Sequence, residues 1–117
     1  MDKQELGRIG EELAIELLVE KNYEIIERNY RYGHGEIDII AKDGDILVFI
    51  EVKTRENLFF GEPEYGVTKF KQNQIRKVAS GYFYQNGIDE CDCRIDVVAI
   101  LYSPNGKSKI NHITNAF

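Results

Sequence analysis

The sequence predicts a single α/β domain, residues 1–117, in which a mixed central sheet is flanked by two helices. The chain has 117 residues, which is the size of one domain. Its apolar and charged fractions of 43% and 30% are those of an ordinary globular protein. Helical and alternating hydrophobic patterns follow one another in the order helix, strand, hairpin, helix, strand, strand. We expect the hairpin to place its polar residues at one edge of the sheet, with the first helix behind them and the second beside them.

Residues 3–20 have the hydrophobic spacing of an amphipathic helix, which Lys21-Asn22 ends. Small residues on one side would let this helix lie close to the sheet, and Glu11 lies at the edge of its apolar stripe. The apolar positions are Leu6, Ile9, Leu13 and Leu17, and the small ones are Gly7, Gly10 and Ala14.

Residues 23–32 predict a first strand, placed at a sheet edge because polar and apolar side chains occur on both of its faces. Arg31, near its end, would either balance nearby acidic side chains, contact a phosphate, or lie on the surface as an ordinary arginine.

The hairpin is predicted from two apolar runs, residues 36–41 and 46–53. Asp43-Gly44 lies between them, and both residues accept the positive φ that tight hairpin turns require. We expect an even-numbered loop that pairs Ala41 with Ile46.

Acidic side chains crowd one face of this hairpin. In the expected register Glu36 lies opposite Glu51, Asp38 lies diagonal to Glu51, and Lys53 shares the face. Like charges directly opposite are destabilising, and a bound divalent cation is the simplest way to offset them. The alternative is an exposed edge with scattered charges, which the apolar character of the other hairpin positions disfavours.

Residues 67–86 predict the second helix, and Lys71 falls in the middle of its apolar stripe. Either the stem of Lys71 packs while its ammonium group reaches solvent, or the side chain reaches the carboxylates of the hairpin. We favour the second arrangement.

Two strands complete the chain. Residues 94–102 are apolar enough to be buried on both faces, which predicts a central strand paired in parallel after the helix. Asp96 within it is expected to form a structural ion pair, with Arg94 or Lys71, and not to bind metal. Residues 109–114 predict a short last strand.

Asp38 followed by Glu51-Val52-Lys53 resembles the Asp…(Asp/Glu)-x-Lys site of the restriction-endonuclease-like nuclease superfamily. The segments GEIDII and FIEVKTR resemble more closely the bacterial UPF0102 (YraN-like) family, and the resemblance covers nearly the whole chain. That family is related to archaeal Holliday-junction resolvases. The resemblance implies a restriction-endonuclease-like core.

The same resemblance implies a metal-dependent endonuclease that cleaves DNA phosphodiester bonds and is specific for DNA structure, such as junctions or branches. Asp38 and Glu51 would bind Mg²⁺ or Mn²⁺ with the carbonyl oxygen of Val52. Lys53 would orient or deprotonate the attacking water, or offset developing charge. Two further carboxylates would extend the metal shell, Glu36 and Glu11. The alternative is a non-catalytic nucleic-acid-binding or assembly protein that retains the nuclease fold.

The net charge of −5 argues against a protein that coats nucleic acid. Residues 65–88, however, contain no Asp or Glu, so a local basic field is available to hold a phosphate backbone. The alternative is a solvated basic helix face. The candidate DNA contacts are Arg31, Arg55, Lys69, Lys71 and Arg76.

No apolar run approaches membrane-spanning length and the N-terminus is polar, so we expect a cytoplasmic protein. The two cysteines, Cys91 and Cys93, are too close for an easy disulfide and too few for a zinc site, which predicts reduced thiols.

The loop after Arg55 carries three aromatic residues, Phe59, Phe60 and Tyr65. They would pack under the next helix, stack on exposed bases, or form the contact of a homodimer large enough to span a duplex.

Overall fold

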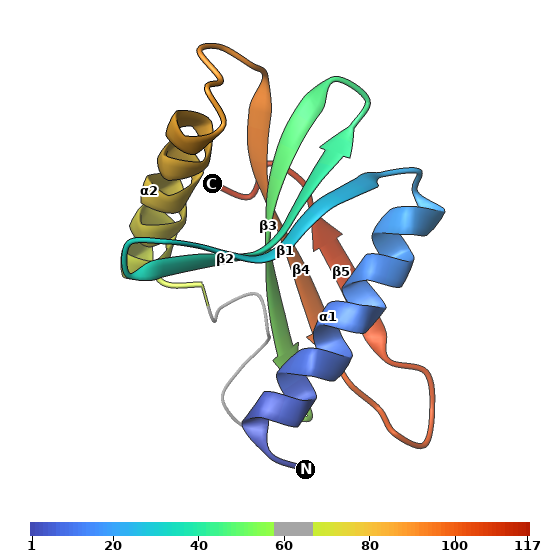
Figure 1. The fold of residues 1–117 in the computed structure, drawn as a ribbon. Helices are drawn as coiled ribbons and strands as arrows, with labels where there is room; N and C mark the ends of the chain where they lie inside the picture. Colours follow the sequence, from blue (N-terminus) through green and yellow to red (C-terminus); the bar gives the residue numbers. More distant parts are fainter. Residues whose placement is uncertain (58–66) are drawn as a thin grey trace.

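The computed structural model describes residues 1–57 and 67–117, which form an α/β fold with a mixed sheet (Figure 1). The loop aromatics Phe59, Phe60 and Tyr65 fall outside these ranges. The boundaries lie within two residues of those predicted. The elements are α1 (Lys3–Glu20), β1 (Glu24–Tyr32), β2 (Gly35–Asp43), β3 (Ile46–Arg55), α2 (Lys69–Gln85), β4 (Cys93–Leu101) and β5 (Lys109–Ile113).

Both helices begin at a capping side chain. Asp2 accepts a hydrogen bond from the Glu5 amide at 2.8 Å, and Thr68 accepts one from the Lys71 amide at 3.2 Å. The cap at Thr68 explains why α2 starts two residues later than predicted. Neither helix in the described ranges is long and apolar enough to cross a membrane.

The five strands found in residues 1–57 and 67–117 follow one another across the sheet in chain order. β3 and β4 are parallel, and the other neighbours are antiparallel. The structure therefore confirms that β4 is an inner strand paired in parallel, although β3 occupies the middle of the sheet, and it confirms the edge position of β1. Cys93, the first residue of β4, and Cys91, just before the strand, are free thiols as predicted.

The turn between β2 and β3 differs from the expected one. Asp43 pairs with Ile46, so the loop consists of Gly44 and Asp45 alone, and Ala41 does not pair with Ile46. Gly44 has a φ of 61°, at the position where a type II′ turn has its glycine. A turn of this type fits the twist of the two strands. The predicted register between β2 and β3 is therefore wrong by two residues.

A shift of two residues keeps each side chain on its predicted face and changes only its partner. The last pair of the ladder is Ile39 with Ile50, and continuing this register by one residue brings Asp38 to the position across from Glu51. Glu36, which was expected opposite Glu51, instead pairs with β1. The crowding of acidic groups therefore centres on Asp38 and Glu51.

β2 and β3 separate beyond this point. β2 continues along β1 as far as Gly35, whereas β3 continues along β4 as far as Arg55. We call the place just beyond the Ile39–Ile50 pair, where β2 and β3 part, the fork. The predicted position at a sheet edge is wrong, because β3 is the central strand and the fork opens in the middle of the sheet.

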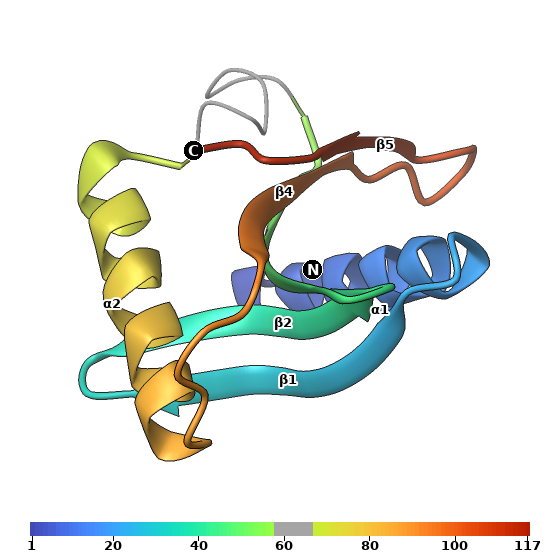
Figure 2. The same cartoon turned by 90° about the horizontal axis from the view of Figure 1, so that it is seen from above.

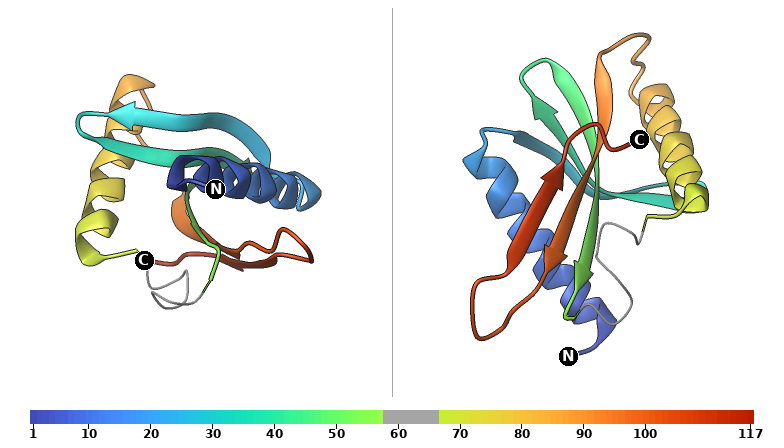
Figure 3. Two further views of the ribbon diagram at one scale, coloured as in Figure 1. Left: turned by 90° about the horizontal axis from the view of Figure 1, so that it is seen from below. Right: turned by 180° about the vertical axis from the view of Figure 1, so that it is seen from behind.

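The core is divided between the two faces of the sheet. Alternate residues of β3 point to opposite faces: Val48 and Ile50 pack in the cluster that includes Leu18 of α1, and Leu47 and Phe49 pack in the cluster of α2. Figure 2 shows α2 standing beside the β1–β2 hairpin, and Figure 3 shows α1 running along the strands.

A close approach between α1 and β3 depends on Gly10. A Cβ atom at this position would lie 1.9 Å from Oγ1 and 2.9 Å from Cβ of Thr54. Gly10→Ala should therefore lower the free energy of unfolding by about 1–3 kcal/mol, the usual cost of overpacking. Gly7→Ala is the matched control, because its Cβ would meet nothing within 4 Å. It should be neutral or stabilising by up to about 1 kcal/mol. Urea denaturation of both variants measures the difference, and equal midpoints would contradict the assigned contact.

A buried network of charges joins β4 to β5. Asp96 is 0% exposed and pairs with Arg94 at 3.0 Å, which confirms one of its two predicted partners; Lys71 is not involved. His112 lies 2.8 Å from the other carboxylate oxygen, and the Asn115 amide donates to Asp96 at 3.0 Å. Each oxygen of Asp96 is therefore hydrogen-bonded, which makes its burial tolerable.

Candidate active site

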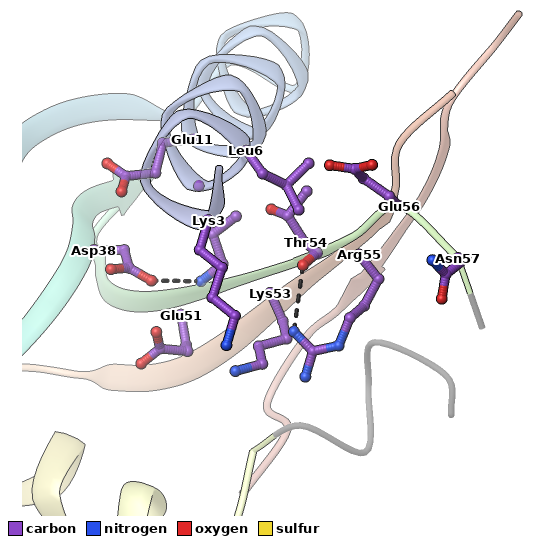
Figure 4. Close-up of a pocket in the computed structure, with 12 residues that line it drawn as sticks. Lys3, Leu6, Glu11, Asp38, Glu51, Lys53, Thr54, Arg55, Glu56 and Asn57 are labelled. Atoms are coloured by element: carbon purple, nitrogen blue, oxygen red, sulfur yellow. Dashed lines mark hydrogen bonds between the residues drawn. The ribbon is translucent and has the colours of Figure 1, made fainter. Parts of the chain in front are cut away.

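An open cleft of about 820 Å³ lies at the fork, between the first turns of α1 and the second half of β3 (Figure 4). Acidic and basic side chains share its wall. They include Lys3, Glu11, Asp38, Glu51, Lys53 and Arg55. The structure thus brings the three predicted catalytic residues together in one cleft.

Asp38 is fixed by the backbone of the neighbouring strand. Its Oδ2 accepts a hydrogen bond from the Val52 amide at 2.8 Å, shown as a dashed line in Figure 4. This bond takes the place of a ladder bond where the strands part, and it holds the Asp38 carboxylate next to Glu51.

Glu51 is the most strongly perturbed group of the cleft. It is 7% exposed, and burial, a hydrogen bond with Asp38 and the charge of Asp38 raise the pKa of Glu51 to about 9. Lys71 and Lys53 act in the opposite direction but do not outweigh these causes. Among the described residues, no hydrogen-bond partner reaches the Oε2 atom of Glu51. A buried acceptor of this kind is costly until a ligand satisfies it.

Two lysines flank Glu51. The Nζ of Lys71 lies 3.6 Å from Glu51 Oε2, too far for a hydrogen bond but close enough for an ion pair, which confirms that Lys71 faces the carboxylates. In Figure 4 Lys53 lies on the same side of β3 as Glu51. Burial and the charges of Arg55 and Lys71 lower the pKa of Lys53, although Glu51 partly offsets them.

A second group of side chains lies beside Asp38. Asn29 Nδ2 donates to Glu11 at 3.1 Å and to Glu36 at 3.0 Å, and Arg31 pairs with Glu36 at 3.2 Å. Burial and the charge of Asp38 raise the pKa of Glu11, which places Glu11 within the electrostatic field of the site. Arg31 therefore balances an acidic side chain, one of its predicted roles.

Two residues of this region were not predicted from the sequence. Lys3 lines the cleft from the first turn of α1, and the amide of Asn29 links two of the acidic residues. The signal for Lys3 was available, because the helix that carries Glu11 also brings its own first turn to the fork.

The donor set suits a small divalent cation. Asp38 and Glu51 offer hard carboxylate oxygens, and Glu51 Oε2 lacks a hydrogen-bond partner in the part of the chain that the structure describes. No group of three or more His, Cys, Asp or Glu side chains within the described ranges is close enough to hold an ion by itself. This agrees with an ion such as Mg²⁺, which keeps several waters and binds one or two carboxylates.

The predicted DNA contacts lie partly inside this cleft and partly outside it. Arg55 lines it and donates to the carbonyl of Thr54 at 3.3 Å. Lys69 and Arg76 are exposed on α2, and Arg76 lies 5.4 Å above the ring of Phe117. A smaller hollow of about 340 Å³, which Lys71 lines together with Glu51 and Lys53, connects the start of α2 to the acidic residues.

Comparison with known proteins gives a consistent result. The model of the uncharacterised protein family UPF0102 matches residues 10–100. A UPF0102 protein of Geotalea daltonii is 47% identical over 116 residues, which cover 99% of this chain and 91% of the relative. Those of Dictyoglomus turgidum and Caldicellulosiruptor saccharolyticus are 42% and 45% identical over the full length of both chains. None of these descriptions states an activity.

Proposed function

The chain belongs to the uncharacterised protein family UPF0102, and we propose that it is a metal-dependent endonuclease that hydrolyses phosphodiester bonds in DNA. The observation that carries the proposal is the buried carboxyl group of Glu51, which faces Asp38 and lies between Lys53 and Lys71. A cation satisfies the carboxylates, and the lysines suit the anionic phosphodiester.

The acidic residues would hold Mg²⁺ or Mn²⁺. Asp38 and Glu51 are the primary ligands in this proposal, the carbonyl of Val52 is a further one, and Glu11 and Glu36 extend the shell. The bound ion would supply Lewis acidity, which polarises the phosphate and activates a water molecule.

The lysines have separate roles in the proposal. The lowered pKa of Lys53 increases the fraction of neutral amine, the only form that can take a proton from the attacking water; alternatively, Lys53 orients that water. Lys71, which pairs with Glu51 at 3.6 Å, keeps a positive charge beside the phosphate and offsets the charge that develops on it.

The proposed substrate is DNA with a defined structure, such as a junction or a branch. Lys3, Lys53 and Arg55 would contact the strand in the cleft, and the exposed basic residues of α2 would contact the backbone beside it. These are charges suited to phosphate, not a pattern for reading bases. The preference for branched DNA rests on the resemblance to Holliday-junction resolvases, which is an analogy.

The test is incubation with supercoiled, single-stranded and branched DNA in Mn²⁺, in Mg²⁺ and in chelator. We expect the wild type to cleave DNA in Mn²⁺ or Mg²⁺ and not in chelator. Asp38→Asn removes one ligand charge at nearly constant shape, so this variant should not cleave DNA in any of the three buffers. Binding of DNA without cleavage on every substrate would favour the second candidate, a non-catalytic nucleic-acid-binding or assembly protein.

The basic face of α2 gives a separate prediction. Lys69→Ala and Arg76→Ala should each weaken binding to all DNA sequences about equally, and each lost phosphate contact should reduce the slope of log affinity against log salt by about 0.9. Lys42→Ala is the control, because Lys42 is exposed next to the β2–β3 turn, at the other end of β3. Titrations at several salt concentrations measure the slopes. Unchanged slopes in all three variants would mean that α2 does not contact DNA.

A further inference from the structure

Asn29 has an unusual backbone conformation for a residue within a strand. Its φ is 52°, in the left-handed region, where residues other than glycine are uncommon. This conformation turns the Asn29 side chain to the same side of β1 as the side chain of Arg28. Arg28 contacts Glu12 at 2.6 Å and Asn29 contacts Glu11 at 3.1 Å, so two consecutive side chains of β1 reach the same helix. Regular alternation would place them on opposite faces of the sheet.

The turned side chain bridges two acidic residues from different elements. Its single amide nitrogen donates to Glu11 of α1 at 3.1 Å and to Glu36 of β2 at 3.0 Å. Ionised carboxylates only accept hydrogen bonds, so the two-hydrogen amide nitrogen is the end of the side chain that faces them. Asp38 lies two residues beyond Glu36 on β2, and the charges of both acids act on Glu11.

We propose that Asn29 is a positioning residue, which holds Glu11 and Glu36 beside Asp38 and so assembles the outer acidic wall of the ion site before the ion arrives. The proposal rests on the function proposed above. A neutral amide suits this task better than a lysine or an arginine would, because it links two carboxylates without adding a positive charge that competes with the ion. Strained conformations of this kind persist where the surrounding structure requires them, as at functional sites.

The test compares Mn²⁺ binding by calorimetry in the wild type and in Asn29→Gly. Glycine accepts a positive φ without strain, so the substitution removes the amide and keeps the backbone. We expect the dissociation constant for Mn²⁺ to rise about 10-fold or more, as for other groups that orient metal ligands. The matched control is Asn22→Gly, the same change at a residue with a φ of 67° at the end of α1. It should leave Mn²⁺ affinity unchanged.

A double-mutant cycle tells a positioning role from a general loss of structure. If Asn29 acts through Glu11, Asn29→Gly in the Glu11→Gln background should weaken Mn²⁺ binding clearly less than it does in the wild type. Equal losses in the two backgrounds, or no loss in the wild type, would overturn the proposal for Asn29 and leave the proposed function standing. A wild type that binds no Mn²⁺ would overturn the proposed function, and this role with it.

Discussion

Glu51→Gln should abolish DNA cleavage and at the same time raise the melting temperature of the metal-free protein. The two effects have one cause. Glu51 is buried next to a second carboxylate, and its Oε2 lacks a hydrogen-bond partner among the described residues. Gln keeps the size of the side chain but cannot ionise to bind a cation, so cleavage should fall by about 100-fold or more, as for other positioned electrostatic groups. The metal-free wild type keeps a proton on Glu51 that the unfolded chain releases, and this proton uptake opposes folding. Gln is neutral in both states and removes this cost, and each kcal/mol removed should raise the melting temperature by about 4 °C.

The matched control is Glu16→Gln, which makes the same substitution at an exposed position of α1 that does not line the cleft. It should change neither the melting temperature nor the cleavage rate. Melting curves in chelator and cleavage assays in Mn²⁺ measure both effects. A less stable Glu51→Gln protein would mean that Glu51 is held as an ion pair with Lys71 and is not a group awaiting a cation.

The pH dependence of stability follows from the same pKa. A carboxyl whose folded pKa is about 9, against 4.5 in the reference state, keeps a proton in the folded protein that the unfolded chain has lost. In chelator the wild type should therefore lose stability as the pH rises through this window, and Glu51→Gln should lose less. Mn²⁺ must displace that proton, so its affinity should increase over the same pH range.

Asp96→Asn should give the largest loss of stability, about 3–5 kcal/mol, because it removes one partner of a buried ion pair. Burial alone would raise the pKa of Asp96, but hydrogen bonds from His112, Arg94 and the Asn115 backbone outweigh it and lower that pKa. The carboxylate is therefore stabilised in the folded state. The stabilisation that Asp96 contributes is complete above the pKa that Asp96 has in the unfolded chain. It is lost as the pH falls through the lower pKa that Asp96 has in the folded protein.

Asp43→Asn is the matched control, because Asp43 also pairs with Arg94, at 3.1 Å, but its side chain is 42% exposed. Exposed pairs contribute little, so this variant should lose less than about 1 kcal/mol. Guanidinium unfolding of the two variants measures the comparison. Equal and small losses would show that the fold tolerates an uncompensated Arg94, and the importance assigned to the network would be wrong.

The faces of the hairpin could be predicted from the sequence, whereas its register could not. Alternation alone places Glu51 and Lys53 on one side of a strand, and this survives a shift of two residues. The partner of Glu51 depends on the length of the turn. Asp43-Gly44 signals a turn but does not state whether two or four residues close it.

Lys71 and Asn29 illustrate the same limit in the candidate site. The position of Lys71 on an apolar stripe favoured the arrangement in which it faces the carboxylates, but it also allowed the ammonium group to reach solvent, and only the structure decides between the two. The role of Asn29 depends on one backbone dihedral and on where α1 crosses the sheet. Both are tertiary properties, and no local pattern in ERNYR encodes them.

The bond between the Val52 amide and Asp38 also provides an intrinsic spectroscopic probe. Its acceptor is a side chain on the other arm of the fork, so this amide hydrogen is protected from exchange with solvent for as long as Asp38 stays in place. Its neighbours on β3 owe their protection to β4. The exchange rate and chemical shift of this single proton therefore report how the two halves of the sheet stand relative to each other, without any label being added to the protein.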